Sequence, residues 1–150
     1  MREKKTFEEL GGRPILEKVM KLFYDKIYPH EWIGQYFKDV PQKVIEAQQV
    51  DFMTHALGGP NIYCGKLPIP AHKHMMITED LFALRQSLLK EALQEAGACD
   101  ELCERWLAID EAFRPKLIKK SVSECEARFK DDEILNFDNP KSQSTTKKAA

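Results

Sequence analysis

Helical periodicity, interrupted by proline and glycine, runs through nearly the whole chain. Apolar side chains first recur every three or four positions at Leu16, Met20, Phe23 and Ile27. The same spacing returns in three later stretches, which begin near Pro41, Thr78 and Asp100. Apolar residues at this spacing line one face of an α-helix, and no run alternates in the manner of a strand. The sequence therefore predicts an all-α fold.

Capping and breaking residues set the expected ends of these helices. Thr6 with Glu9 has the pattern of a capping box for a short first helix. Thr78 is placed to cap the longest helical pattern, and Pro115 should kink or restart the last one. Between them, a loop rich in proline and glycine should end in a short helical turn around His72.

Length and charge restrict the class of protein. A chain of 150 residues suits one domain, and 23 basic residues against 24 acidic ones leave a net charge of -1. This balance gives no basic surface for nucleic acid or for an anionic membrane. No stretch reaches the roughly 20 apolar residues of a membrane span, and the charged N-terminus lacks the apolar core of an export signal. We therefore expect a cytoplasmic protein with free thiols at its four cysteines.

The C-terminal end differs in composition from the rest of the chain. Beyond Phe137 the sequence is polar and reads DNPKSQSTTKKAA. Such a segment cannot bury enough apolar surface to offset the entropy of ordering it. We expect a domain of residues 1–127, followed by a largely disordered extension of residues 128–150.

Two polar residues fall on apolar helix faces. Gln49 lies between Ile45 and Met53, and Tyr24 lies on the buried side of its own helix. A buried polar group without a partner costs about 1–3 kcal/mol, so the two side chains must bond to each other, to the backbone or to a ligand. Apolar walls with a few placed polar groups are typical of a ligand pocket.

The segment PAHKHMMIT holds two histidines and leaves two kinds of metal site open. A zinc site needs three or four ligands, for which Cys64, His72 and His74 are candidates, but a second pair with regular spacing is missing. Haem iron needs only one axial imidazole, with an apolar cavity supplying the remaining affinity. The haem interpretation fits the sequence better.

Several linked segments resemble the truncated haemoglobins, most closely the first group of that family. The segments are FEELGG, KLFYDKIY, QYFKDV, QQVDFMTHALGGP and NIYCGKLPIPAH, and the resemblance covers about residues 6–120. It implies the truncated globin fold, a two-on-two helical sandwich around non-covalently bound haem b. By position His72 would be the proximal iron ligand, whereas His74 falls where the family has none and is expected on the surface or in a loop.

The resemblance also assigns the distal side. Tyr24 would donate a hydrogen bond to the bound ligand, with Gln49 as its partner. Ile45 stands where many globins have a distal histidine, which predicts a five-coordinate ferrous iron. The remaining contacts to haem or to an access tunnel would come from Phe37, Phe52, Met53 and Tyr63.

The family's ligands are dioxygen, nitric oxide and carbon monoxide. The resemblance implies oxygen binding and possible nitric oxide dioxygenation to nitrate, for which an external reductase would be needed. The alternative is a haem-based gas sensor or interaction module that signals through the C-terminal extension.

Arg85 departs from the family pattern, because the first group usually has an apolar residue at its place. We expect its stem to run along the edge of the core with the guanidinium in water. A functional interpretation places the guanidinium at a haem propionate or in the distal pocket.

Overall fold

The structure is a computed structural model that describes residues 4–63, 65 and 67–140. Its elements are α1 (Gly12–Ile27), η1 (Ile33–Phe37), α2 (Gln42–Ala56), α3 (Pro68–His72), α4 (Glu79–Ala96), α5 (Asp100–Leu117) and η2 (Val122–Glu124). Within the described ranges the only β pairing is an isolated bridge between Met75 and Leu135. The prediction of an all-α fold is confirmed.

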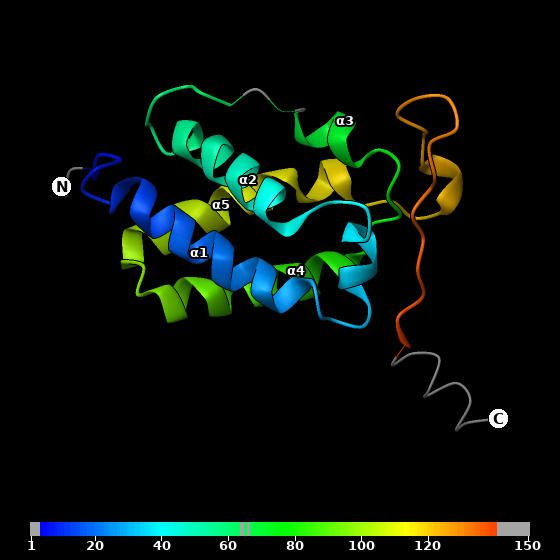
Figure 1. Cartoon of the computed structure of the whole chain (residues 1–150), viewed down its shortest axis with the longest axis horizontal. Coiled ribbons are helices and arrows are strands. Elements are labelled where there is room, and N and C mark those ends of the chain that lie inside the picture. Colours follow the sequence, from blue (N-terminus) through cyan, green and yellow to red (C-terminus); the bar gives the residue numbers. More distant parts are fainter. Residues whose placement is uncertain (1–3, 64, 66, 141–150) are drawn as a thin grey trace.

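The helices form two pairs. α1 packs against α2 and also against α4, and α4 packs against α5, so that the α1–α2 pair lies on the α4–α5 pair (Figure 1). The apolar residues that the sequence placed on the face of the first long helix, Leu16, Met20, Phe23 and Ile27, are all buried in the shared core. This arrangement is the predicted two-on-two sandwich.

The helix ends follow the capping residues, with one correction. The amide of Thr6 donates to the Glu9 carboxylate at 3.0 Å and the Glu9 amide donates to the Thr6 hydroxyl at 3.1 Å, which completes the capping box. The residues that follow form a turn rather than the predicted short helix. Gly11 and Gly12 have φ angles of 120° and 63°, so the chain reverses there before it can complete a helix.

Helix α4 begins and ends at the predicted capping residues. The Thr78 hydroxyl accepts a hydrogen bond of 3.1 Å from the amide of Leu81, and Gly97 ends α4 with a φ of 76°. Pro115 lies inside the last turn of α5, which ends two residues later at Leu117.

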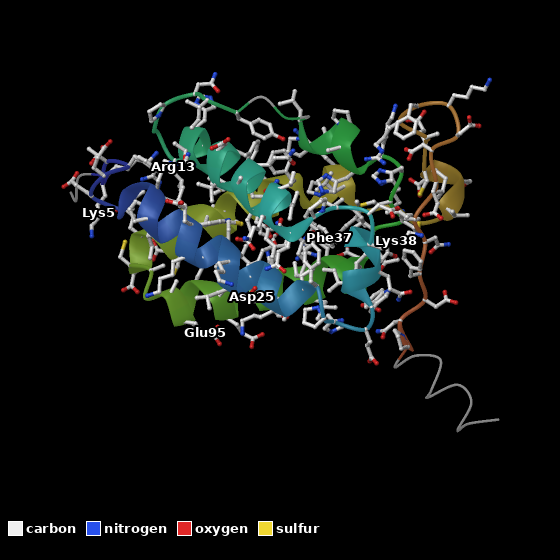
Figure 2. The ribbon with its side chains drawn as sticks, in the orientation of Figure 1. Lys5, Arg13, Asp25, Phe37, Lys38 and Glu95 are labelled. Atoms are coloured by element: carbon white, nitrogen blue, oxygen red, sulfur yellow. The ribbon has the colours of Figure 1, made fainter. Side chains whose placement is uncertain are left out.

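Ion pairs join α1 to both of its neighbours at the surface. Arg13 contacts Asp51 of α2 at 2.9 Å, and Lys26 contacts Glu95 of α4 at 2.9 Å. Figure 2 shows Arg13 and Glu95 on the outside of the helices that they connect. Exposed pairs of this kind contribute about 0–1 kcal/mol, so apolar packing carries the stability of the two layers.

The C-terminal segment, defined here as residues 128–140, contacts the helical domain, whereas composition alone predicts disorder there. It runs along one end of the helical sandwich, as the orange trace in Figure 1 shows. The Leu135 amide donates to the His74 carbonyl at 2.9 Å, and the Met76 amide donates to the Leu135 carbonyl at 2.7 Å. The Trp32 indole also donates to the Phe137 carbonyl at 2.7 Å. Residues 141–150 lie outside the described residues, and the domain boundary at residue 127 stays a prediction.

The side chains of the C-terminal segment explain why it is held. Leu135 is buried, and the ring of Phe137 packs edge-on against Tyr36 at 5.0 Å between centroids. Lys38 pairs with Glu133 at 2.7 Å, on the side of the molecule where Figure 2 labels it. The sequence beyond Phe137 is polar, but the residues that make these contacts are Phe137 itself and residues before it. None of the described helices is both long enough and apolar enough to cross a membrane.

Candidate functional site

A mainly apolar cavity lies between the two helix pairs. Its walls come from α1, η1, α2, the loop that follows α2, α3, the loop before α4, α4 and α5. The lining residues are Met20, Ile33, Tyr36, Phe37, Gln49, Phe52, Met53, Tyr63, Pro68, Ala71, His72, Met75, Ile77, Leu81, Phe82, Arg85, Trp106, Ile109, Asp110, Phe113 and Leu117. One imidazole, one amide and one ion pair therefore face a cavity whose other walls are largely aliphatic and aromatic.

His72 is the last residue of α3 and lines the cavity. Its Nδ1 lies 2.6 Å from the carbonyl oxygen of Pro68, which fixes Nδ1 as the protonated nitrogen and orients the ring. Burial lowers the pKa of the imidazole, so the ring is neutral at pH 7. Nε2 then keeps its lone pair, which is the state that an iron ligand requires.

His74 is buried and does not line the cavity. Its Nδ1 has no hydrogen-bond partner among the described residues, and burial lowers the pKa of this histidine to about 4. His74 lies in the turn after α3, as the loop alternative expected, but it is buried rather than on the surface, because the backbone of Leu135 bonds to this stretch. The structure thus brings only His72 of the two histidines to the cavity.

A zinc site gains no support from the described residues. No group of three histidine, cysteine, aspartate or glutamate side chains there is arranged to hold a metal ion. Cys64, the third candidate ligand of the zinc alternative, lies outside the described residues. His72 and His74 also point to different surroundings, which a shared metal would not allow.

Tyr24 is buried directly behind the cavity wall. Its ring packs edge-on against Phe37, which lines the cavity, at 5.8 Å between centroids, and against Phe23 at 4.9 Å. Burial raises the pKa of its hydroxyl well above the usual range, and no hydrogen bond to a described residue contributes to that pKa. The hydroxyl is therefore protonated at neutral pH and keeps its hydrogen available for a ligand. Figure 2 shows Phe37 in the interior of the molecule.

α2 supplies most of one wall. Gln49, Phe52 and Met53 all line the cavity, and the ring of Phe52 packs edge-on against Tyr63 at 5.3 Å between centroids. Ile45 is half-buried and does not line it. Six of the eight predicted site residues therefore lie on the cavity wall, while Tyr24 and Ile45 stand behind it.

The sequence analysis misplaced one polar residue and missed another. The guanidinium of Arg85 on α4 forms an ion pair with the carboxylate of Asp110 on α5, and both residues line the cavity. The Arg85 head is paired with Asp110 at the cavity wall instead of extending freely into water, although its side chain is 30% exposed. Asp110 had a signal that was overlooked, since it lies four residues after Trp106 and three before Phe113 on the apolar face of α5.

The residues present fit a haem. A neutral imidazole with an available Nε2 stands on the wall of an apolar cavity, and aromatic side chains suited to packing against a porphyrin line the walls. A two-on-two helical sandwich with a single such imidazole defines the class of globins with a shortened fold.

Comparison with known proteins shows which globins these are. The family model described as Bacterial-like globin matches residues 5–118. A Group 1 truncated hemoglobin of Tetrahymena thermophila is 37% identical over 103 residues, which cover 68% of this chain and 85% of that protein. The chain belongs to the bacterial-like globin family and, within it, to the group 1 truncated haemoglobins.

Solved structures agree with this assignment. The truncated hemoglobin of Tetrahymena pyriformis in its Fe(III) form is 32% identical, with a TM-score of 0.68 over 76% of this chain and 97% of that chain. A Group II truncated hemoglobin from Bacillus anthracis superimposes with a TM-score of 0.71 at 22% identity, over 79% of this chain and 95% of that chain, which shows the shared fold. Membership of this family implies a haem cofactor and the binding of gaseous ligands such as dioxygen.

Proposed function

We propose that this protein binds dioxygen, and also nitric oxide and carbon monoxide, at a five-coordinate haem iron whose only protein ligand is His72. The observation that carries the proposal is the placement of His72, on the cavity wall with its Nδ1 bonded to the Pro68 carbonyl at 2.6 Å. Haem b would be held without a covalent bond, by the apolar walls and this one imidazole. His74 is buried away from the cavity and does not compete for the iron.

The distal side would be served by Tyr24 and Gln49. Gln49 lines the cavity, and Tyr24 lies behind Phe37 with a protonated hydroxyl that no described residue accepts. If it turned toward the cavity, this hydroxyl would donate a hydrogen bond to a ligand, and such a bond is strongest in an apolar surrounding. Ile45 offers no nitrogen, so no second imidazole is aimed at the metal.

Other side chains on the wall would hold the haem. Phe37 would pack on the porphyrin, while Phe52 and Met53 line the distal side or an access path. Tyr63 stands at the end of the described loop after α2, where its hydroxyl would reach a propionate. The pocket thereby keeps water away from the ligand and sets its polarity.

A finer part of the proposal is nitric oxide dioxygenation in the cytoplasm. When bound, haem iron would supply the binding site and one electron for the conversion of nitric oxide and dioxygen to nitrate. An external reductase would then return that electron. Tyr24 and Gln49 would orient dioxygen by donating hydrogen bonds, and the apolar walls would admit nitric oxide. Mixing the oxygenated protein with nitric oxide should give one nitrate per haem, and the absence of nitrate would exclude this activity.

The first experiment is the absorption spectrum of the protein reconstituted with haemin. Wild type should give a five-coordinate ferrous spectrum, and His72→Ala should lose it or change it strongly. His74→Leu is the matched control and should keep the wild-type spectrum. Failure of wild type to take up haem would end the proposal, and a normal spectrum for His72→Ala would move the iron ligand elsewhere.

A haem-based sensor is the second candidate, and the C-terminal segment favours it. This segment bonds to the backbone of His74 and Met76, which lie two and four positions after the proposed iron ligand. Movement of His72 on ligand binding would therefore shift the C-terminal segment through these hydrogen bonds. Deleting residues 128–150 discriminates between the two functions: unchanged ligand kinetics and unchanged haem retention would exclude signalling through this route.

A further inference from the structure

The ion pair between Arg85 and Asp110 is the feature of the cavity that the proposed function leaves unexplained. Both side chains line the cavity, and the two are 30% and 9% exposed. The amide of Gln86 adds only a long hydrogen bond of 3.4 Å to the second carboxylate oxygen of Asp110. Replacing a buried pair with apolar residues of similar size is often neutral or stabilising, so stability alone does not account for charges at this place.

The guanidinium lies over two buried aromatic rings, although the Arg85 side chain is 30% exposed. Its central carbon lies 5.4 Å from the ring centroid of Phe23 and 6.0 Å from that of Phe82, and both rings are buried. Asp110 engages one of its terminal nitrogens, which leaves other N–H donors of the planar group without a carboxylate. The guanidinium is therefore fixed against aromatic side chains on the cavity wall.

The charge of Arg85 also acts on Tyr24, which is proposed to face the ligand. Burial raises the pKa of the Tyr24 hydroxyl, and the nearby Arg85 charge partly opposes that rise. Arg85 is thus a positive group on the wall of the cavity in which the ligand would be held.

We propose that Arg85, positioned by Asp110, is a third polar residue of the ligand pocket and makes the pocket favour small anions over neutral ligands of similar size. This inference rests on the proposed haem function. Arg85 would donate hydrogen bonds to an anion on the iron, and Asp110 would fix the guanidinium while partly neutralising its charge. The ligand class is the monovalent inorganic anion of two or three atoms, for which azide and cyanide are suitable probes.

Equilibrium binding of azide to the ferric protein and of carbon monoxide to the ferrous protein tests this inference. Arg85→Leu should weaken azide binding about tenfold, because it removes a charged hydrogen-bond donor, and should leave carbon monoxide within about twofold. Arg85→Lys keeps the charge without the planar fork and should fall between wild type and Arg85→Leu. Asp110→Asn should strengthen azide binding about threefold, since it removes a competing negative charge.

A spectroscopic readout separates a pocket charge from a general disturbance. The C–O stretching frequency of the carbonyl form falls when a positive group faces the ligand, so Arg85→Leu should raise it. Arg114→Leu is the matched control, because Arg114 lies over the same Phe82 ring at 4.6 Å but does not line the cavity. The control should leave both the azide affinity and the stretching frequency at their wild-type values.

Several results would overturn the inference. The inference fails if Arg85→Leu changes neither the azide affinity nor the C–O stretching frequency. It also fails if Arg114→Leu changes both as much as Arg85→Leu does. Faster haem loss in Arg85→Leu with unchanged azide affinity would assign Arg85 to a propionate instead. If Arg85→Leu does not fold, the double variant Arg85→Leu/Asp110→Leu leaves no unpaired charge and should show the same loss of azide affinity. Absence of haem uptake by wild type would be a failure of the proposed function itself.

Discussion

His72 and His74 are two residues apart, yet their rings occupy opposite surroundings. His72 faces the cavity and its Nδ1 lies 2.6 Å from the carbonyl oxygen of Pro68. The ring of His74 is buried under the C-terminal segment, and its Nδ1 meets no partner among the described residues. The short helix α3 ends between them, so the chain turns and the two side chains separate.

The unpartnered nitrogen of His74 predicts the effect of its removal. A buried polar atom without a hydrogen bond costs about 1–3 kcal/mol, so His74→Leu should raise the free energy of unfolding by about 1 kcal/mol. Haem uptake should not change. Urea unfolding of both proteins at pH 7 measures the difference. A variant less stable than wild type would show that the imidazole has a favourable partner that compensates its burial.

Tyr24 and Tyr28 allow the ligand role of one hydroxyl to be separated from the structural role of another. The Tyr24 hydroxyl bonds to no described residue, whereas the Tyr28 hydroxyl donates to the Val40 carbonyl at 2.5 Å. Tyr24→Phe should therefore leave stability within about 0.5 kcal/mol and speed dioxygen dissociation about tenfold. Tyr28→Phe should have the opposite effect: the free energy of unfolding should fall by about 1 kcal/mol, and the rate of dioxygen dissociation should not change.

Stopped-flow dissociation of dioxygen and urea unfolding, made on both tyrosine variants, check this crossed pattern. Equal dissociation rates in wild type and Tyr24→Phe would remove Tyr24 from the distal site. A large loss of stability in Tyr24→Phe would instead show that its hydroxyl supports the fold.

Local patterns in the sequence predicted the four long helices, and the family resemblance supplied most of the predicted residues on the cavity wall. Helical spacing placed Gln49 and Met53 on one face of α2, and the caps at Thr78 and Gly97 fixed α4. These features depend on residues close together in the chain. The resemblance then identified which of two neighbouring histidines belongs at the cavity, a choice that spacing alone left open.

Contacts between segments that are distant in the chain could not be predicted from local patterns. Arg85 and Asp110 each fall on the apolar side of a helix, but they are 25 residues apart, and spacing within one helix cannot show that they pair. The burial of His74 depends on Leu135, 61 residues later in a stretch without helical spacing. Composition predicted disorder there because it cannot show that a single leucine and one aromatic ring find places on the folded domain.

Asp132 predicts how the C-terminal segment responds to acid. Its hydrogen bond with the Arg128 side chain, at 2.8 Å, holds the pKa of the carboxyl well below its usual range. A depressed pKa means that this contribution to stability is present above about pH 4 and is lost as the pH falls below that value. The protection of the amides in residues 128–137, measured relative to their intrinsic exchange rate at each pH, should therefore fall on acidification below pH 4.

A matched pair of amide substitutions tests this assignment. Asp132→Asn should exchange faster than wild type already at pH 7 and should lose most of the additional acid dependence. Asp131→Asn is the control. Asp131 is exposed and has a φ of 68°, a backbone conformation that asparagine tolerates. The same acid dependence in wild type and Asp132→Asn would place the titrating group elsewhere.

Leu135 is predicted to be the apolar residue that holds the C-terminal segment. It is 7% exposed, whereas Phe129 in the same segment is 56% exposed. Leu135→Ala should lower the free energy of unfolding by about 2–3 kcal/mol and speed haem loss, because its buried side chain anchors the backbone that bonds to the stretch after His72. Phe129→Ala should change stability by less than about 0.5 kcal/mol. Urea unfolding and haem transfer to an excess of an acceptor apoglobin measure both effects. If the two variants are equally stable, the segment is held by its backbone hydrogen bonds, and Leu135 contributes little to the proximal side.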